Sequence, residues 1–212
     1  MKLYFSFITA LVMAMTIVSC QSQDNNVADV PIPQSIVEKK ASLTEEFLIT
    51  SYSVGKAEIG MNYGYLTAIL GDEYKSELLS SFMVDINAIA ISKEGEILYY
   101  LLFPVGVDID ELTPIQVIMT DNPRYATQEG ISVGTKIKDV ETVYGTPTFG
   151  YNVNNESREY VEFSNHPATS ISFRPNSEES GFAGVYGQDI QEYNQTNSYQ
   201  DDAVISSIEV YP

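Results

Sequence analysis

The sequence predicts an α+β fold built from two tandem units, each a short helix followed by a three-stranded antiparallel meander. Two glycine-bounded segments match at a constant offset of 74 residues, because Gly60 and Gly71 correspond to Gly134 and Gly145. Each segment has apolar residues at helical spacing, and each precedes short runs rich in β-branched and aromatic residues. We therefore expect one sheet with the short helices packed on one of its faces.

The first 19 residues resemble a cleavable secretory signal, because Lys2 precedes an uncharged, mostly apolar stretch. Residues 17–20 end in Ser19-Cys20, which resembles the lipobox of bacterial lipoproteins. Cys20 is the only cysteine of the chain, so it can form no intramolecular disulfide. We expect it to carry the lipid that anchors the protein to a membrane, most simply the outer membrane. The alternatives are ordinary cleavage that leaves a free thiol and a permanent transmembrane helix.

Residues 20–41 are predicted to be the lipidated cysteine and a flexible tether. This stretch is polar, contains Pro31 and Pro33, and shows no sustained apolar period, so it offers little apolar surface to offset its ordering entropy. The remaining residues, 42–212, are the right size for one domain. Within that domain we expect the first unit at about residues 46–121 and the second at about 125–212.

The first unit contains the earlier of the two predicted helices. Asn62 is a typical N-cap residue, and Gly71 can adopt the left-handed conformation that ends a helix. Leu66, Ile69 and Leu70 share one helical face, which we expect to pack against the sheet. The predicted strands of this unit are residues 46–52, 84–92, 96–103 and 115–120, with the hairpin loop at 93–95.

The second unit contains the later predicted helix. Thr135 can cap its start, Gly145 can end it, and Pro147 prevents its continuation. The apolar face of this helix consists of Ile137, Val140, Val143 and Tyr144.

Three strands follow the second helix, at residues 158–163, 169–173 and 204–211. Residues 176–202 contain three glycines and are rich in Gln, Asn and Tyr. A segment of this composition between two strands is typical of a surface insertion.

Residues 130–147, read GISVGTKIKDVETVYGTP, resemble the helical signature of the outer-membrane assembly lipoprotein BamE (SmpA/OmlA) and its relatives. With Thr127 to Gly134 they also resemble envelope lipoproteins of uncharacterised role. The resemblance, and a weaker one to the tandem-repeat β-lactamase inhibitor protein, implies short helices packed on an antiparallel sheet and a surface that binds protein. The chain departs from BamE in having two such segments and a long acidic insertion, so the resemblance does not imply membership of that assembly machine.

The charge balance argues against nucleic acid as a partner. Lys and Arg number 11 against 29 Asp and Glu, a net charge of −18. Such a surface repels phosphate backbones, although it could favour cationic partners or divalent ions. The simpler interpretation is that the charge keeps a tethered protein soluble.

The sequence lacks the residues that several classes of enzyme need for catalysis. The only histidine, His166, lies in a turn-like stretch without a nucleophile elbow, so we expect it to be an exposed loop residue. Gly181, Gly184 and Gly187 have neither the spacing nor the following helix of a nucleotide-binding loop. With one histidine and one cysteine, a zinc site is poor in ligands. We therefore expect a protein that is not an enzyme and needs no cofactor.

Carboxylates offer the strongest ligand hypothesis. Asp108, Asp110 and Glu111 place oxygen atoms close together in a predicted loop, and Asp201 and Asp202 form a second cluster. Neither matches the twelve-residue calcium loop with its central glycine. These acids are therefore candidates for a calcium site, with solvated loop acids as the alternative.

Tyrosines are the other candidates for binding. Tyr151, Tyr186, Tyr193 and Tyr199 lie in predicted loops, where tyrosine supplies rigid contact area at small entropy cost. Packing of the loops themselves and stacking on sugars are the alternatives. We thus expect a non-enzymatic module that binds another envelope protein. The alternative is a module that binds or hydrolyses glycan or peptide, with calcium assisting.

Overall fold

The computed structural model describes residues 31–212, which form one compact unit. The predicted signal, the Cys20 lipidation site and the first part of the predicted tether lie outside the described residues. Within residues 31–212, no helix has both the length and the apolar character needed to cross a membrane.

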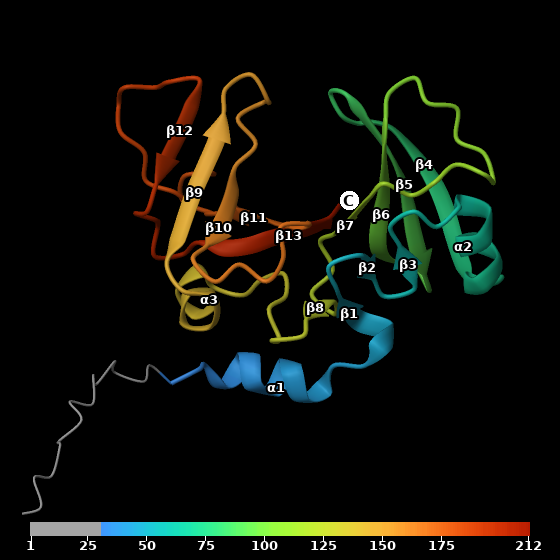
Figure 1. The fold of residues 1–212 in the computed structure, drawn as a ribbon, viewed down its shortest axis with the longest axis horizontal. Helices are drawn as coiled ribbons and strands as arrows, with labels where there is room; N and C mark the ends of the chain where they lie inside the picture. Colours follow the sequence, from blue (N-terminus) through green and yellow to red (C-terminus); the bar gives the residue numbers. More distant parts are fainter. Residues whose placement is uncertain (1–30) are drawn as a thin grey trace, which may run out of the picture. The chain divides into compact units, whose positions relative to one another are not determined.

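Residues 31–212 form mainly β structure (Figure 1). The helices are short: α1 (Gln34–Ser42), the 3-10 helix η1 (Glu45–Phe47), α2 (Tyr63–Leu70) and α3 (Ile137–Tyr144). The strands are β1 (Leu48–Ile49), β2 (Ser53–Val54), β3 (Ala57–Glu58), β4 (Tyr74–Met83), β5 (Ile86–Lys93), β6 (Glu96–Pro104), β7 (Val117–Thr120), β8 (Ala126–Thr127), β9 (Pro147–Asn152), β10 (Tyr160–Phe163), β11 (Ile171–Asn176), β12 (Tyr193–Thr196) and β13 (Val204–Val210).

These strands form two sheets. The larger has nine strands in the order β12-β9-β10-β11-β13-β7-β6-β5-β4, and every neighbouring pair is antiparallel. The smaller has the order β3-β2-β1-β8, with β1 and β8 parallel. The centre of the large sheet is the pair β13 and β7, where Ile208 lies opposite Thr120.

The predicted α+β fold of helix-plus-three-strand units is therefore wrong. β4 and β9, the strands that directly follow α2 and α3, were not predicted. Most of β4 is exposed and it lies at the edge of the sheet, so it lacks the apolar alternation of a half-buried strand. β9 begins at Pro147 and contains Gly150, residues depleted in strands. β12 lies inside the predicted insertion, and the predicted strand 46–52 is mostly η1 and the two-residue β1.

The two predicted helices are present, with eight residues each, and they end as expected. Gly71 and Gly145 follow them with φ of 75° and 77°, which confirms the prediction of positive φ, but their ψ of −174° and −165° differ from the expected left-handed helical conformation. The predicted Thr135 cap is wrong, because the N-cap position of α3 is Lys136, while the Thr135 hydroxyl accepts a bond from the backbone of Ser132.

The apolar faces of α2 and α3 were predicted largely correctly. Asn62 occupies the N-cap position of α2, although its side chain forms no capping bond. Ile69 is 40% exposed and does not belong to the packed face. The residues that do pack into the core are Leu66, Leu70, Ile137, Val140 and Tyr144, with Val143 partly buried against it.

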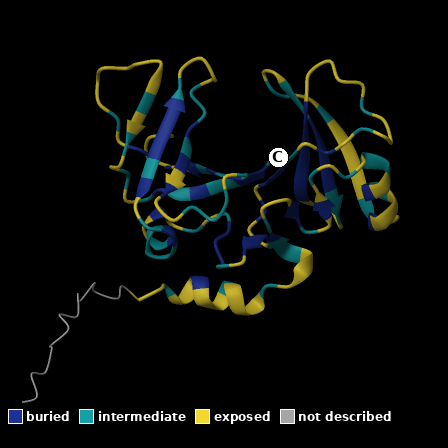
Figure 2. Cartoon of the chain, viewed as in Figure 1, coloured by how far each residue is buried: buried dark blue, intermediate teal, exposed yellow. Residues whose placement is uncertain are grey.

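Residues 34–42 form α1, although they fall largely in the stretch predicted to be a flexible tether. Ile36 of α1 is only 2% exposed. The backbone of α1 lies directly on Gly130, where a Cβ atom would come within 2.6 Å of the Ile36 carbonyl oxygen. The Lys39 ammonium also donates to the Pro123 carbonyl at 2.6 Å. Residues 34–42 thus belong to the fold, though most of α1 is exposed (Figure 2).

One face of the large sheet supplies the main hydrophobic core. Alternate residues of its strands pack there with the helices and the small sheet. This face includes Ile89, Ile91, Leu101, Ile118, Phe149, Val161, Phe173, Ile208 and Val210. The opposite face carries a different set of side chains, which forms the candidate site.

Candidate functional site

The face of the large sheet opposite the main core is the candidate functional site, and we call it the open face. A single row of paired residues crosses it from β11 to β5. Ser172 lies opposite Glu209, and Glu209 lies opposite Met119. Met119 lies opposite Tyr100, and Tyr100 lies opposite Ala90. Because residues directly opposite one another in antiparallel strands point to the same side, the open face changes from polar to apolar between β13 and β7.

The apolar half of the open face covers β5, β6 and β7. Phe82 of β4 lies over Tyr100, with ring centroids 4.9 Å apart. The irregular end of β4 allows this, since its pairing with β5 shifts register before Met83 and Ser81 has a φ of 54°. The buried residues of this second apolar cluster are Ala88, Ala90, Tyr100, Leu102 and Met119.

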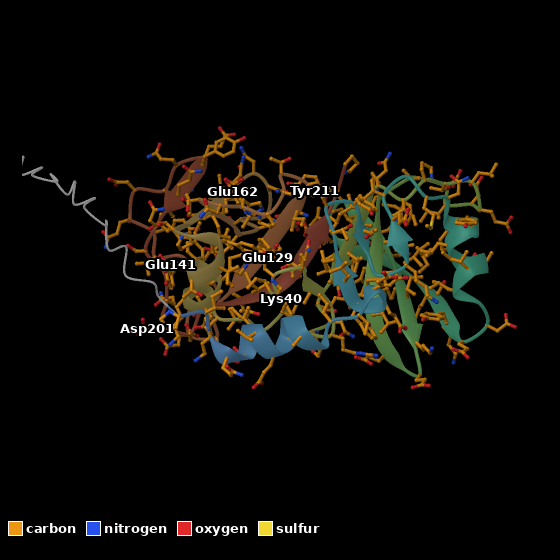
Figure 3. The ribbon with its side chains drawn as sticks, turned by 60° about the horizontal axis from the view of Figure 1, so that its bottom comes forward. Lys40, Glu129, Glu141, Glu162, Asp201 and Tyr211 are labelled. Atoms are coloured by element: carbon orange, nitrogen blue, oxygen red, sulfur yellow. The ribbon has the colours of Figure 1, made fainter. Side chains whose placement is uncertain are left out.

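The polar half of the open face contains a pocket of about 600 Å³ over β9, β10, β11 and β13. Glu162 of β10 and Tyr211, which follows β13, both line it and are labelled in Figure 3. Its other lining residues include Asn152, Asn155, Arg158, Tyr160, His166, Ser172, Arg174, Tyr193 and Glu209.

A half-buried ion pair lies in this pocket. The Arg174 Nε donates to Glu209 Oε1 at 3.0 Å, and its Nη2 donates to Oε2 at 3.1 Å. The third guanidinium nitrogen, Nη1, donates to the Glu159 carbonyl at 3.3 Å. Because the Glu209 side chain is only 11% exposed, removing Arg174 alone would leave a carboxylate with little water to replace its partner.

Arg158 links the two halves of the open face. Its Nη2 donates to Asp85 Oδ1 at 3.3 Å and to Asn155 Oδ1 at 2.6 Å. Its Nη1 lies 3.2 Å from the Met83 sulfur, and its Nε lies 3.3 Å from a Glu156 oxygen. The contact with Asp85 joins the turn between β4 and β5 to the loop between β9 and β10, so the end of β4 is held beside the pocket.

Tyrosines form much of the pocket wall. The Tyr160 ring lies across Gly150, where an added Cβ atom would come within 2.6 Å of the Tyr160 hydroxyl. Tyr193 of β12 is 67% exposed. The pKa of Tyr211 is raised, chiefly by burial and then by the negative charges of Glu162 and Glu209, with Arg174 acting in the opposite direction. The pocket therefore has a negative electrostatic character near Tyr211.

Glu159 anchors the segment that carries Tyr193. Its carboxylate accepts bonds from the backbone N–H groups of Ala183 (2.7 Å) and Gly184 (2.8 Å) and from the Tyr186 hydroxyl (2.7 Å). Burial raises the pKa of Glu159, against the lowering effect of these three hydrogen bonds. The insertion is thus fixed to the end of β10 by a buried acid.

Of the four candidate tyrosines, only Tyr193 lies in the pocket. Tyr151 and Tyr186 pack against each other, with ring centroids 4.7 Å apart, and both also contact Phe182. The Tyr199 hydroxyl donates to Glu141 at 2.7 Å, and burial raises its pKa to about 12. Three of the four therefore pack within the chain, and the predicted loop positions of Tyr151 and Tyr193 are wrong, since these residues belong to β9 and β12.

The candidate calcium ligands do not converge. The Asp110 carboxylate accepts bonds from the Leu112 backbone and the Thr113 hydroxyl, both at 2.9 Å, which closes its own turn. Glu111 contacts α2 through its backbone, since its carbonyl accepts from Gly64 at 2.9 Å. In the part of the chain that the structure describes, no three His, Cys, Asp or Glu side chains, Asp108 included, gather as metal ligands would.

His166 is partly buried rather than an exposed loop residue. Its Nδ1 accepts from the Phe163 backbone N–H at 3.3 Å, so its Nε2 carries the proton and donates to the Ile171 carbonyl at 2.8 Å. Both ring nitrogens therefore hold the loop between β10 and β11. The ring also packs against Phe173, with centroids 5.4 Å apart.

The pocket residues other than Tyr193 were not predicted as site residues. Arg174 and Glu209 lie in or beside predicted strands, and the local pattern shows only that both are polar. The sequence does contain a partial indication of the role of Arg174. Cationic residues are few in this chain, and one that lies beside an apolar strand position needs a polar partner. Their pairing joins residues 35 positions apart, which short-range patterns do not show.

Comparisons with known proteins give a likeness to solved structures alone. No family model and no curated protein sequence matches the chain. Among solved structures, the chain is similar to the uncharacterized protein YfeY from Escherichia coli, with a TM-score of 0.48 and 13% sequence identity. That likeness covers 77% of this chain and 99% of YfeY.

Proposed function

We propose that this chain is a non-enzymatic lipoprotein of the bacterial cell envelope that binds another protein through the open face. The observation that carries the proposal is the continuity of that face. An apolar half, in which the partly buried Phe82, Met83 and Val117 pack over the buried Tyr100 and Met119, adjoins a polar pocket around Arg174 and Glu209. Protein interfaces combine an apolar centre with polar, hydrogen-bonding surroundings in this way.

Exposed apolar side chains beside the open face add contact area. Val84 is 77% exposed and Val105 is 55% exposed. They are neighbours in space, because Val105 donates its backbone N–H to the carbonyl of Asp85 at 3.0 Å. Asp85 is also the residue that Arg158 holds from the other half. Two exposed valines thus lie beside Asp85, which Arg158 joins to the loop between β9 and β10.

The lipid anchor is the second part of the proposal and rests on the lipobox-like residues 17–20 and the single cysteine. Replacing Cys20 with serine should abolish lipoprotein processing and release the protein from membrane fractions. The measurement is fractionation of cells that produce either form, with the protein's mass showing whether residues 1–19 are removed. If Cys20→Ser is processed at the same bond and stays with membranes, the anchor is not on Cys20.

Site-specific photo-crosslinking tests the protein partner. The photoreactive residue p-benzoylphenylalanine would replace Tyr193, which lies in the pocket, or Tyr65, which lies on α2. The two positions are a matched pair, because both are tyrosines with similar exposure, 67% and 61%. We expect a discrete protein adduct in intact cells from position 193 alone. Equal adducts from both positions, or none from position 193, would rule out the open face as the binding surface.

A second candidate function is binding of glycan or peptide. The observation that favours it is that Tyr160, Tyr193 and Tyr211 share the pocket with the amides of Asn152 and Asn155, since aromatic rings and planar amides suit sugar hydroxyls. Digestion of the adduct from position 193 separates the two: protease should release a protein partner, whereas a glycan-degrading enzyme should release a glycan.

A further inference from the structure

Within residues 31–212, Glu162 is the carboxylate of the pocket that forms no ion pair. It is exposed on β10, and it belongs to none of the five ion pairs formed within residues 31–212. The other acid of the pocket, Glu209, is neutralised by Arg174 through two hydrogen bonds. Arg158 is likewise committed, to Asp85 and its own loop.

The electrostatic field in the pocket favours a cation. Burial raises the pKa of Tyr211 most, and the negative charges of Glu162 and Glu209 raise it further, each with a larger effect than the opposing charge of Arg174. An anion entering the pocket would meet this field and find both arginines already paired. The net charge of −18 attracts cationic partners from a distance as well.

The pocket wall supplies further contacts for a cation on an aliphatic stem. Tyr160, Tyr193 and Tyr211 line the same pocket as Glu162, and the faces of aromatic rings attract cationic groups. The volume of about 600 Å³ holds one long side chain.

We propose that this pocket, which Tyr160, Tyr193 and Tyr211 line, takes a lysine or arginine side chain of the protein partner, with its charged group paired to Glu162. The proposal rests on the proposed function, since it names the group by which a partner would be recognised. The expected occupant of the pocket is therefore a basic side chain of a protein, and not a sugar or an anion.

Titration of the full chain in detergent micelles with small amides tests the pocket chemistry. The probes are the N-acetyl methylamides of lysine and of norleucine, which differ in the ammonium group, and N-acetylglucosamine. Their binding is read from the NMR signals of the tyrosine rings. We expect the lysine amide alone to shift the Tyr193 and Tyr211 signals, with weaker binding at higher salt. Equal shifts with norleucine, or shifts with the sugar alone, would overturn the proposal.

Two matched variants assign the effect to Glu162. Glu162→Gln removes the pocket charge, and Glu58→Gln removes another exposed charge, on β3, so both change the net charge by one. We expect Glu162→Gln to weaken binding of the lysine amide roughly five-fold, as an exposed ion pair allows, and Glu58→Gln to leave it unchanged. If the lysine amide binds Glu162→Gln as tightly as the parent, the proposal is wrong.

The two proposals can fail separately. If the protein adduct from position 193 forms with the same yield in the Glu162→Gln variant, the proposed function stands, but a basic side chain of the partner does not pair with Glu162. Absence of the adduct in the parent chain would remove the proposed function itself.

Discussion

Replacing Glu159 with alanine should strongly destabilise the domain and loosen the segment that presents Tyr193. Glu159 is 8% exposed, and it is the acceptor for the backbone N–H groups of Ala183 and Gly184, both of which are buried. Alanine would leave these two donors without a partner, at a cost of about 1–3 kcal/mol each. Loss of the Tyr186 bond adds about 1 kcal/mol. The expected total, about 3–7 kcal/mol, is a large part of the stability of an ordinary domain.

Tyr186→Phe is the matched control for this prediction. It removes only the 2.7 Å bond to Glu159 and keeps the ring that packs on Tyr151, so it should cost about 1 kcal/mol. Urea unfolding of each variant, followed by far-ultraviolet circular dichroism, gives the free energies of unfolding. The reasoning is refuted if Glu159→Ala costs no more than Tyr186→Phe.

Three further predictions concern the pH response, α2 and α1. Because burial raises the folded-state pKa of Glu159, its protonation stabilises the folded state below the ordinary glutamate pKa of about 4.3. This contribution is lost as the pH rises through the folded-state pKa. The free energy of unfolding of the parent, measured in urea relative to that of the non-titrating Glu159→Gln variant, should therefore fall as the pH rises above about 4. A difference between the two proteins that does not change with pH would contradict the raised pKa of Glu159. Leu66→Ala should lower the free energy of unfolding by about 2–5 kcal/mol, since Leu66 is fully buried. Ile69→Ala should lower it much less, since Ile69 is 40% exposed. Equal losses for the two variants would mean that the packed face of α2 is misassigned. Gly130→Ala should cost about 2 kcal/mol more than Gly134→Ala. Both glycines have positive φ, but an added Cβ meets the backbone of α1 only at Gly130, so equal thermal stability of the two variants would show that α1 does not rest there.

The local elements were predictable where short-range chemistry decides them. The positions of α2 and α3 follow from apolar residues at helical spacing and from a glycine at each end. The cap of α3 was misplaced by one residue, because Thr135 instead closes the turn before the helix by accepting a bond from the Ser132 backbone. Such competition between a turn and a cap depends on backbone geometry that a sequence pattern does not contain.

The sheet was less predictable, because its strands are defined by distant partners. β4 pairs on one side only and is mostly solvated, so nothing in its sequence alternates as a half-buried strand would. The union of both halves in one nine-stranded sheet depends on the pairing of β13 with β7, for example Ile208 with Thr120. No local pattern carries a pairing over that separation.

The candidate site was the least predictable part. Loop tyrosines were the right type of residue, but Tyr151, Tyr186 and Tyr199 are used within the chain, and only Tyr193 lines the pocket. The pocket depends instead on strand residues such as Arg174, whose role appears only when β11 and β13 pair. The choice between packing and binding is therefore made by tertiary contacts.

The central claim, that a protein occupies the open face, is tested most directly by the crosslink from position 193 with and without a blocked pocket. Ser172 lies in the pocket opposite Glu209, so Ser172→Trp should fill the pocket from its floor without entering the main core. The account predicts a protease-sensitive adduct in intact cells that is lost when Ser172→Trp is added, while the folded state is retained by circular dichroism. An adduct of unchanged yield in the folded Ser172→Trp chain would contradict the account.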